Sequence, residues 1–119
     1  LYPTGSKQNM TIEKFTKYYR ESDIVAGDFL YIKKHMPSDM TDKIIVTNTI
    51  TAEDVIELKA RGVRMLVTST PELGGRSFGT NVMEAVVACL AGKSPEEIGV
   101  DGFREIFKEI GIKYRVEYF

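Results

Sequence analysis

Cysteine is almost absent from this sequence, since Cys89 is the single one among its 119 residues. One cysteine excludes a disulfide within the chain and favours a reducing, cytoplasmic setting. Histidine is equally scarce, with His35 alone, and no cluster of His, Cys, Asp or Glu has the spacing of a metal site. We therefore expect no internal disulfide and no bound metal.

Excess charge and long apolar runs are absent as well. The 16 Lys and Arg residues nearly balance 17 Asp and Glu, and a net charge of −1 gives no electrostatic ground for binding nucleic acid or an anionic membrane. No apolar run approaches the roughly 20 residues of a membrane span. With 43% hydrophobic and 28% charged residues, the composition is typical of a soluble globular domain. The chain begins at Leu1 without a signal-like segment, so we expect residues 1–119 to be one domain from the C-terminal part of a longer protein.

Three short apolar segments have the pattern of buried strands: DIVAG, KIIVTNT and VRMLVTST. Helical patterns of about ten residues separate them, which indicates crossover connections and a parallel sheet with helices on both faces. The last segment, KYRVEYF, alternates and is predicted to be an edge strand. The predicted fold class is therefore α/β, a three-layer Rossmann-like domain with a mostly parallel sheet.

Helix positions follow from capping residues and apolar spacing. A first amphipathic helix is predicted behind Thr11, with Ile12, Phe15 and Tyr19 on one face. Later helix starts are marked by Asp28, by Thr51 with Asp54, and by Ser94 with Glu97.

The helix pattern over residues 82–91 is almost entirely apolar. It predicts the most buried helix of the fold, with Val86, Cys89 and Leu90 in the core. Exposure of this helix would instead indicate an interface with the missing N-terminal part or with a second subunit.

Hydroxyl and amide side chains gather where two predicted strands end, as Thr47 and Asn48 and as Thr68 and Ser69. In open parallel sheets, ligands bind outside the carboxyl ends of the strands, so these residues would line the rim of a ligand site. The same residue types also satisfy free backbone groups at strand ends, and that purely structural role remains the alternative.

The loop over residues 72–81 is rich in glycine and polar side chains. It leads into a helix N-terminus, where backbone N–H groups bind anions, and Arg76 would add charge and a fork of donors. Asn81 with Glu84 is predicted to cap this helix. The loop candidates for binding an anionic group are Arg76, Ser77, Gly79, Thr80 and Asn81. In the alternative, the loop is packed and Arg76 pairs with a carboxylate of the protein itself.

Known nucleotide motifs match this loop only in part. Gly74 and Gly79 have the spacing of a phosphate loop, but Thr80 stands where the lysine belongs, and the pattern G-x-G-x-x-G is absent. Asp28 is the candidate for an acid/base or ligand-orienting group, with a plain N-cap as its alternative role. Cys89 is expected to pack in the core.

Four stretches together resemble a bacterial family labelled as quinate 5-dehydrogenases: PTGSKQ, KYYRESDIVAGDFLYIKKHMP, IIVTNTITAEDVIELKARGV and LVTSTPELGGRSFGTNVMEA. The resemblance covers essentially the whole chain and matches the C-terminal portion of longer family members. It implies a Rossmann-like domain of an oxidoreductase, for which NAD or NADP would be the cofactor. Quinate and shikimate dehydrogenases also have a lysine–aspartate pair and a glycine-rich dinucleotide loop, and no residue here matches either.

Two functions remain open. The first is the ligand- or cofactor-binding part of an NAD(P)-dependent quinate/shikimate-type dehydrogenase that binds an anionic group at the strand carboxyl ends. The second is a non-enzymatic module that binds a small anion or assembles the protein.

Overall fold

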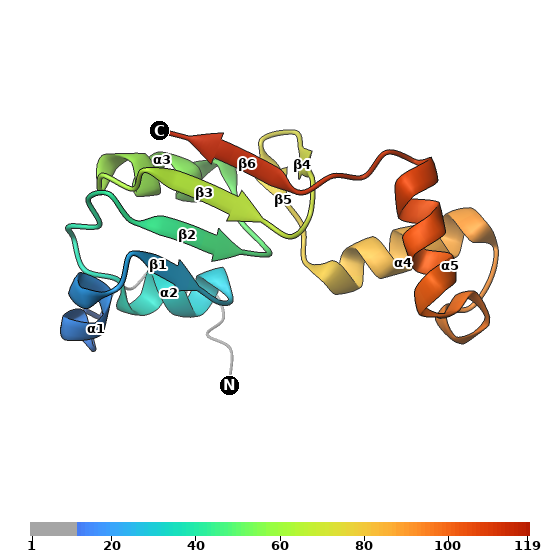
Figure 1. Cartoon of the computed structure of the whole chain (residues 1–119), viewed down its shortest axis with the longest axis horizontal. Coiled ribbons are helices and arrows are strands. Elements are labelled where there is room, and N and C mark those ends of the chain that lie inside the picture. The colour runs from blue at the N-terminus through green and yellow to red at the C-terminus, as the bar shows by residue number, and fades with distance from the viewer. Residues whose placement is uncertain (1–11) are drawn as a thin grey trace.

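The computed structural model describes residues 12–119, so Thr11 and the stretch PTGSKQ lie outside the described part (Figure 1). Its elements in chain order are α1 (Thr16–Glu21), β1 (Ile24–Ala26), α2 (Phe29–His35), β2 (Ile44–Thr47), α3 (Ala52–Ala60), β3 (Met65–Thr68), β4 (Glu72–Leu73), β5 (Arg76–Ser77), α4 (Thr80–Ala91), α5 (Pro95–Glu109) and β6 (Arg115–Tyr118).

A four-stranded sheet with the order β1-β2-β3-β6 forms the centre of the fold. Strands β1, β2 and β3 run parallel, and β6 pairs antiparallel with β3 at the edge. This confirms the predicted parallel strands and the predicted edge strand, and the chain is a mixed α/β domain with a mostly parallel sheet. The short β4 and β5 form a separate hairpin that the sequence did not predict.

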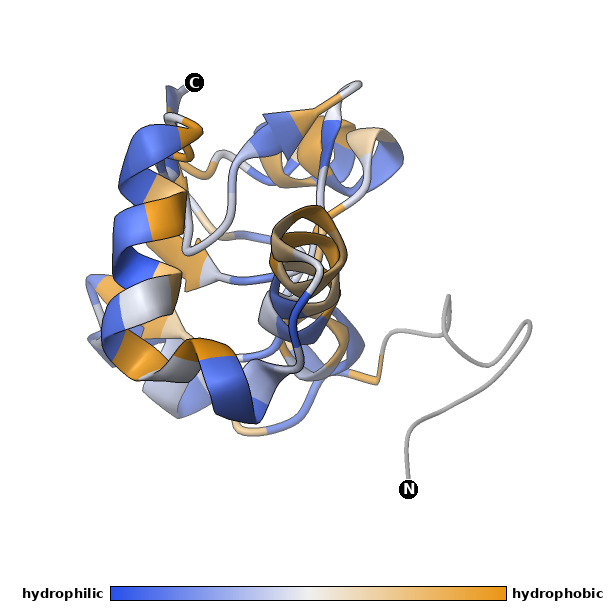
Figure 2. Ribbon diagram, turned by 90° about the vertical axis from the view of Figure 1, so that its right-hand side faces the viewer, coloured by the Kyte–Doolittle hydropathy of each residue, from blue (hydrophilic) through white to orange (hydrophobic). Residues whose placement is uncertain are grey.

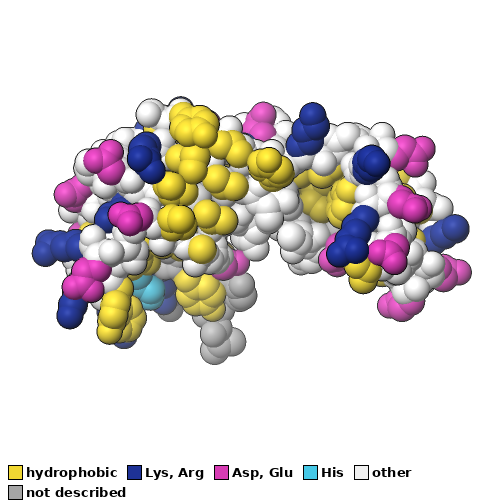
Figure 3. All heavy atoms as spheres, viewed as in Figure 1, with side chains coloured by type: hydrophobic (Ala, Val, Ile, Leu, Met, Phe, Trp, Pro, Cys, Tyr) yellow, Lys and Arg dark blue, Asp and Glu magenta, His cyan; other side chains and the backbone are white. Residues whose placement is uncertain are grey.

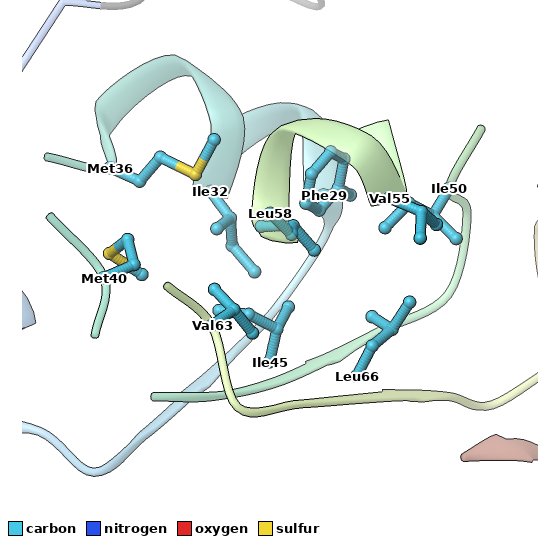
Figure 4. Packing of buried hydrophobic residues seen from close by; sticks show 10 residues of the cluster. All are labelled: Phe29, Ile32, Met36, Met40, Ile45, Ile50, Val55, Leu58, Val63 and Leu66. Atoms are coloured by element: carbon cyan, nitrogen blue, oxygen red, sulfur yellow. The ribbon is translucent and has the colours of Figure 1, made fainter. Parts of the chain in front are cut away.

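The main hydrophobic core lies between the sheet and helices α2 and α3 (Figure 4). Alternate strand residues such as Ile45 and Leu66 point to these helices and are fully buried. Their partners come from both helices and from the loops beside them: Phe29, Ile32, Met36, Met40, Ile50, Val55, Leu58 and Val63.

Three predicted helix starts are confirmed by their hydrogen bonds. The Asp28 side chain accepts from the N–H of Leu30 (2.9 Å) at the start of α2. Thr51 and Ser94 each form a reciprocal capping box with the acidic residue three positions later, at the starts of α3 and α5. These ends depend on neighbouring residues only, which is why the sequence located them.

Helix α1 begins later than predicted, at Thr16 behind Phe15 in a left-handed conformation (φ 62°). Ile12 is not helical, because its N–H donates to the carbonyl of Lys34 (2.7 Å) at the end of α2. A tertiary backbone hydrogen bond therefore replaces the predicted first turn.

The prediction that α4 is the most buried helix is wrong. Met83 and Val87 are buried, but Val86 is 42% exposed, Leu90 is 69% exposed, and Cys89 is exposed too. Helices α4 and α5 pack on each other and extend beyond the carboxyl ends of the parallel strands (Figure 1). We call this pair, Thr80–Glu109, the arm.

The arm makes the molecule elongated. Its extents are 45 × 30 × 25 Å and its radius of gyration is 16.1 Å, whereas a compact domain of this length has about 13.5 Å. Figure 2 shows α4 end-on near the centre, hydrophobic over most of its circumference, while α5 presents hydrophilic residues on its outer side. An apolar helix thus stands outside the core that was predicted to bury it.

The edge strand β6 holds a carboxylate whose charge is stabilised by two cations. Glu117 pairs with Arg115 on its own strand and with Lys59 of α3, whose Nζ lies 3.0 Å from Oε1. Partial burial would raise the pKa of Glu117, but the hydrogen bonds from Arg115 and Lys59 outweigh it and lower that pKa.

A Glu117→Gln variant is expected to lose stability at neutral pH, by about 2–4 °C in melting temperature, because a partly exposed pair contributes at most about 1 kcal/mol. A carboxyl group whose pKa is lowered by folding stabilises the folded state at any pH above its ordinary pKa. This stabilisation is lost as the pH falls through the pKa of the folded state. The two melting temperatures should therefore converge below about pH 4 in a calorimetric pH series. A gap that stays constant down to pH 3 would contradict this account.

Candidate functional site

A row of polar side chains crosses the sheet where β2 and β3 end and β6 begins. Thr47 pairs in register with Thr68, and Thr68 with Arg115. Both threonines are buried on the side of the sheet that α2 and α3 cover. Thr47 Oγ1 and Arg115 Nη1 are buried atoms without a hydrogen-bond partner within residues 12–119. Thr47 and Thr68 therefore point into the protein and do not line an open rim.

Hydroxyl groups next to this row fix the loop that follows β3. Thr68 Oγ1 lies 3.1 Å from Ser77 Oγ, and Ser77 is fully buried. Thr70 Oγ1 lies 3.0 Å from the carbonyl oxygen of Asn48 and also contacts that of Phe78. The Asn48 side chain accepts from the adjacent Thr49 N–H. For Thr68, Ser77 and Asn48, the structure thus shows internal contacts of the kind that the alternative reading expected.

The glycine-rich loop is largely a hairpin. Gly74 and Gly75, with φ of 62° and 86°, form the turn between β4 and β5, which explains why glycine stands at both positions. The guanidinium carbon of Arg76 lies 4.9 Å from the ring centre of Phe78. Within the described part of the chain, no carboxylate pairs with Arg76. The predicted anion contact of Arg76 stays a prediction.

Helix α4 begins without a side-chain cap. Its N-cap is Gly79, and Asn81, predicted to cap with Glu84, instead accepts from the N–H of Val82 (3.0 Å). A Cβ at Gly79 would lie 2.8 Å from Asn81 Oδ1, so a larger residue there would displace the Asn81 side chain. The first turn contains no acidic residue, since Glu84 lies one turn later. The positive end of the helix dipole is therefore not offset by a side chain of that turn.

A cleft of about 370 Å³ opens at this helix start, between the end of β3 and the arm. The sheet side contributes Ser69, Thr70 and Pro71. The arm and the segment before β6 contribute the remaining lining residues, Thr80, Met83, Phe107, Ile112, Lys113 and Tyr114. The cleft combines an apolar wall with hydroxyl groups, one ammonium group and a helix N-terminus.

Sequence reasoning found two of these lining residues, Ser69 and Thr80. It missed Lys113 and Tyr114, which follow α5 and immediately precede β6. The available signal was the predicted edge strand: if antiparallel, it starts at the edge where the parallel strands end, and this brings the residues before it to the ligand side.

Asp28 acts as the N-cap of α2, as its alternative reading expected. It is not part of the cleft lining. A role in acid/base chemistry for Asp28 remains a prediction.

The sheet, the uncapped helix and the cleft define a mixed α/β domain with a pocket at the carboxyl edge of its parallel strands. The family model described as "Domain of unknown function (DUF8754)" matches residues 1–119, and the chain belongs to that family. Comparison with curated proteins and with solved structures gives no match. From residue 12 onward, no helix is both long and apolar enough to cross a membrane.

Proposed function

We propose that this domain binds a small molecule with an anionic group and an apolar body in the cleft between β3 and the arm. The observation that carries the proposal is that an uncapped helix start and Lys113 both line a partly apolar pocket. Helix N-termini and ammonium groups both favour anions. Small-molecule pockets combine apolar walls with a few polar groups in this way.

The apolar wall sets the kind of ligand. Met83 is buried, and Phe107 and Ile112 are half-buried at the surface of the cleft. An inorganic ion alone would leave these side chains without contacts. A carboxylate or phosphate attached to a ring or a short hydrocarbon would use both kinds of wall.

The resemblance to quinate dehydrogenases supports a second candidate. The domain would then be the substrate- or cofactor-binding part of an NAD(P)-dependent quinate/shikimate-type dehydrogenase. Quinate and shikimate are ring carboxylates, so they belong to the ligand class that the cleft favours. A thermal-shift series with quinate, shikimate, NAD, NADP and inorganic phosphate at millimolar concentration tests both candidates, because a bound ligand raises the melting temperature.

A Lys113→Ala variant is expected to weaken binding of the best ligand in that series by about tenfold, which corresponds to about 1.4 kcal/mol for one charged contact. Lys113 is exposed, so the fold should be unaffected. Isothermal titration calorimetry with the same ligand measures the change.

Two further variants make this test specific. Lys93→Ala removes an exposed ammonium of the same chain outside the cleft lining and should leave affinity unchanged. Arg76→Ala tests the loop separately: a loss with Arg76→Ala but not with Lys113→Ala would move the site out of the cleft. Absence of binding to every compound in the series would overturn the proposal.

We also propose that the domain completes a three-layer, Rossmann-like arrangement when it is assembled. Helices α2 and α3 supply one outer layer, and no helix of the described residues covers the opposite, apolar face of the sheet (Figure 3). Parallel sheets are normally covered on both faces.

A further inference from the structure

The uncovered side of the sheet is apolar at every position. Side chains alternate along a strand, so the neighbours of the core residues point the other way. The strand pairings arrange them in two rows across all four strands: Ile24, Ile44, Met65 and Tyr118, then Ala26, Val46, Val67 and Val116. We call these eight residues the open sheet face. Figure 3 shows hydrophobic side chains gathered over this part of the molecule.

The arm carries a second apolar surface, which has no partner among residues 12–119. Met83 and Val87 are the buried residues of α4, in the arm where that helix packs on α5. The side of α4 next to these buried residues carries exposed apolar residues at helical spacing: Val82, Val86, Cys89 and Leu90. We call these four residues the arm stripe. No charged residue belongs to either surface.

The two surfaces do not meet within one chain, because the root of the arm is fixed. Ser77 exchanges two backbone hydrogen bonds with Ile50 (3.0 and 2.8 Å), and Thr70 contacts the carbonyl oxygen of Phe78 one residue further on. The arm therefore leaves the end of the sheet and extends beyond the carboxyl ends of the parallel strands (Figure 1).

We propose that a second copy of this chain covers the open sheet face with its arm, and that the exchange is reciprocal. The dimensions agree: α4 has 12 residues and is about 18 Å long, while the outer strands of a four-stranded sheet lie about 14 Å apart. Each chain carries an arm stripe and an open sheet face, so a dimer with two-fold symmetry covers all four apolar surfaces of its two chains. A stable interface buries about 800 Å² per partner. Two arm–sheet contacts bury more of this area than a single contact does.

The reciprocal exchange supplies the third layer of the proposed architecture and does not depend on which ligand the cleft binds. Each arm keeps its root in its own chain, so the cleft stays intact in the pair. Failure of ligand binding and failure of pairing are therefore separate results.

Sedimentation velocity over a concentration series tests the pairing, with a dimer expected at tens of micromolar. Two variants, Leu90→Glu on the arm stripe and Val116→Glu on the open sheet face, should each raise the dissociation constant of the dimer about tenfold or more. Each places an unpaired charge in the buried interface. The matched control is Ile56→Glu on α3, because Ile56 is 68% exposed and Leu90 is 69% exposed, but Ile56 belongs to neither surface. The dissociation constant of its dimer should be unchanged.

Mixing the two impaired variants gives the sharpest result. A pair of one Leu90→Glu and one Val116→Glu chain keeps one unaltered contact of the two, so the mixture should dimerise more strongly than either variant alone. The thiol of Cys89 gives an independent readout, since its modification by a thiol reagent should slow as the dimer forms.

Other results overturn the proposal. A monomer at all concentrations would do so, and so would a dimer that only one of the two variants weakens, because contacts between two arms or between two sheets have that property. Circular dichroism checks that the variants fold. If Val116→Glu does not fold, Tyr118→Glu replaces it, because Tyr118 lies on the same face and is 76% exposed.

Discussion

Replacing Leu58 by alanine is expected to lower the free energy of unfolding by about 2–5 kcal/mol, the range for a fully buried leucine. Leu58 is on α3 and has no exposed surface; it packs in the cluster between the sheet and the two helices that cover it (Figure 4). The residues around it come from several elements, so the cavity closes poorly and the loss should reach the upper half of that range. Urea unfolding followed by circular dichroism measures it.

Ile56 provides the control on the same helix. Its side chain points to solvent, so Ile56→Ala should change the free energy of unfolding by no more than about 0.5 kcal/mol. Equal losses for the two variants would mean that helix propensity, and not packing on the sheet, determines the stability of α3.

The sequence predicted the central sheet because the relevant signals are local. Residues such as Val46 and Val67 stand in apolar runs between turn residues, and the helices between the strands force the parallel pairing. The capping boxes at Thr51 and Ser94 are contained in four residues each and were read directly. These features need no knowledge of distant parts of the chain.

The prediction failed where burial depends on tertiary position. The apolar pattern of α4 is real, yet Val86 and Leu90 are exposed because the arm extends beyond the sheet. The spacing of apolar residues indicates that one surface of a helix will be covered, but it does not indicate which part of the protein covers it. In the same way, nothing in the residues around Ser69 indicated that Lys113, more than forty positions later, would line the same cleft.

Asp54 is the second residue at which a single change should have a large effect. Its Oδ1 lies 2.7 Å from Lys33 Nζ, which joins α3 to α2. Its Oδ2 accepts from the N–H of Thr51 (3.1 Å) and from the Thr51 hydroxyl (2.8 Å), which caps α3. The side chains of Lys33 and Asp54 are only 17% and 10% exposed. One carboxylate thus holds a helix start and a largely buried cation.

The charge of Lys33 depends on this carboxylate. Burial alone would lower the pKa of Lys33, but the hydrogen bond and the charge of Asp54, with a smaller effect of Glu57, outweigh it and raise that pKa. Without Asp54, the ammonium would keep Glu57, at 3.6 Å, as its carboxylate partner.

Asp54→Ala is therefore expected to lower the free energy of unfolding by about 3 kcal/mol, since it breaks a largely buried ion pair and removes a cap. Lys33→Met should cost less, because it leaves the capping box in place. In the double variant, no buried ammonium remains, so the total loss should be smaller than the sum of the single losses. Additive losses would show that Asp54 acts through its cap alone.

The pH dependence gives a second measurement of the same pair. A lysine whose pKa is raised by folding stabilises the folded state at any pH below its ordinary pKa. This stabilisation is lost as the pH rises through the pKa of the folded state. The difference in free energy of unfolding between the wild type and Lys33→Met should therefore be constant near neutral pH and should decrease above about pH 10.5. Urea titrations at pH 7, 9 and 11 follow it. A difference that does not change up to pH 11 would assign the loss to the packing of the lysine stem and not to its charge.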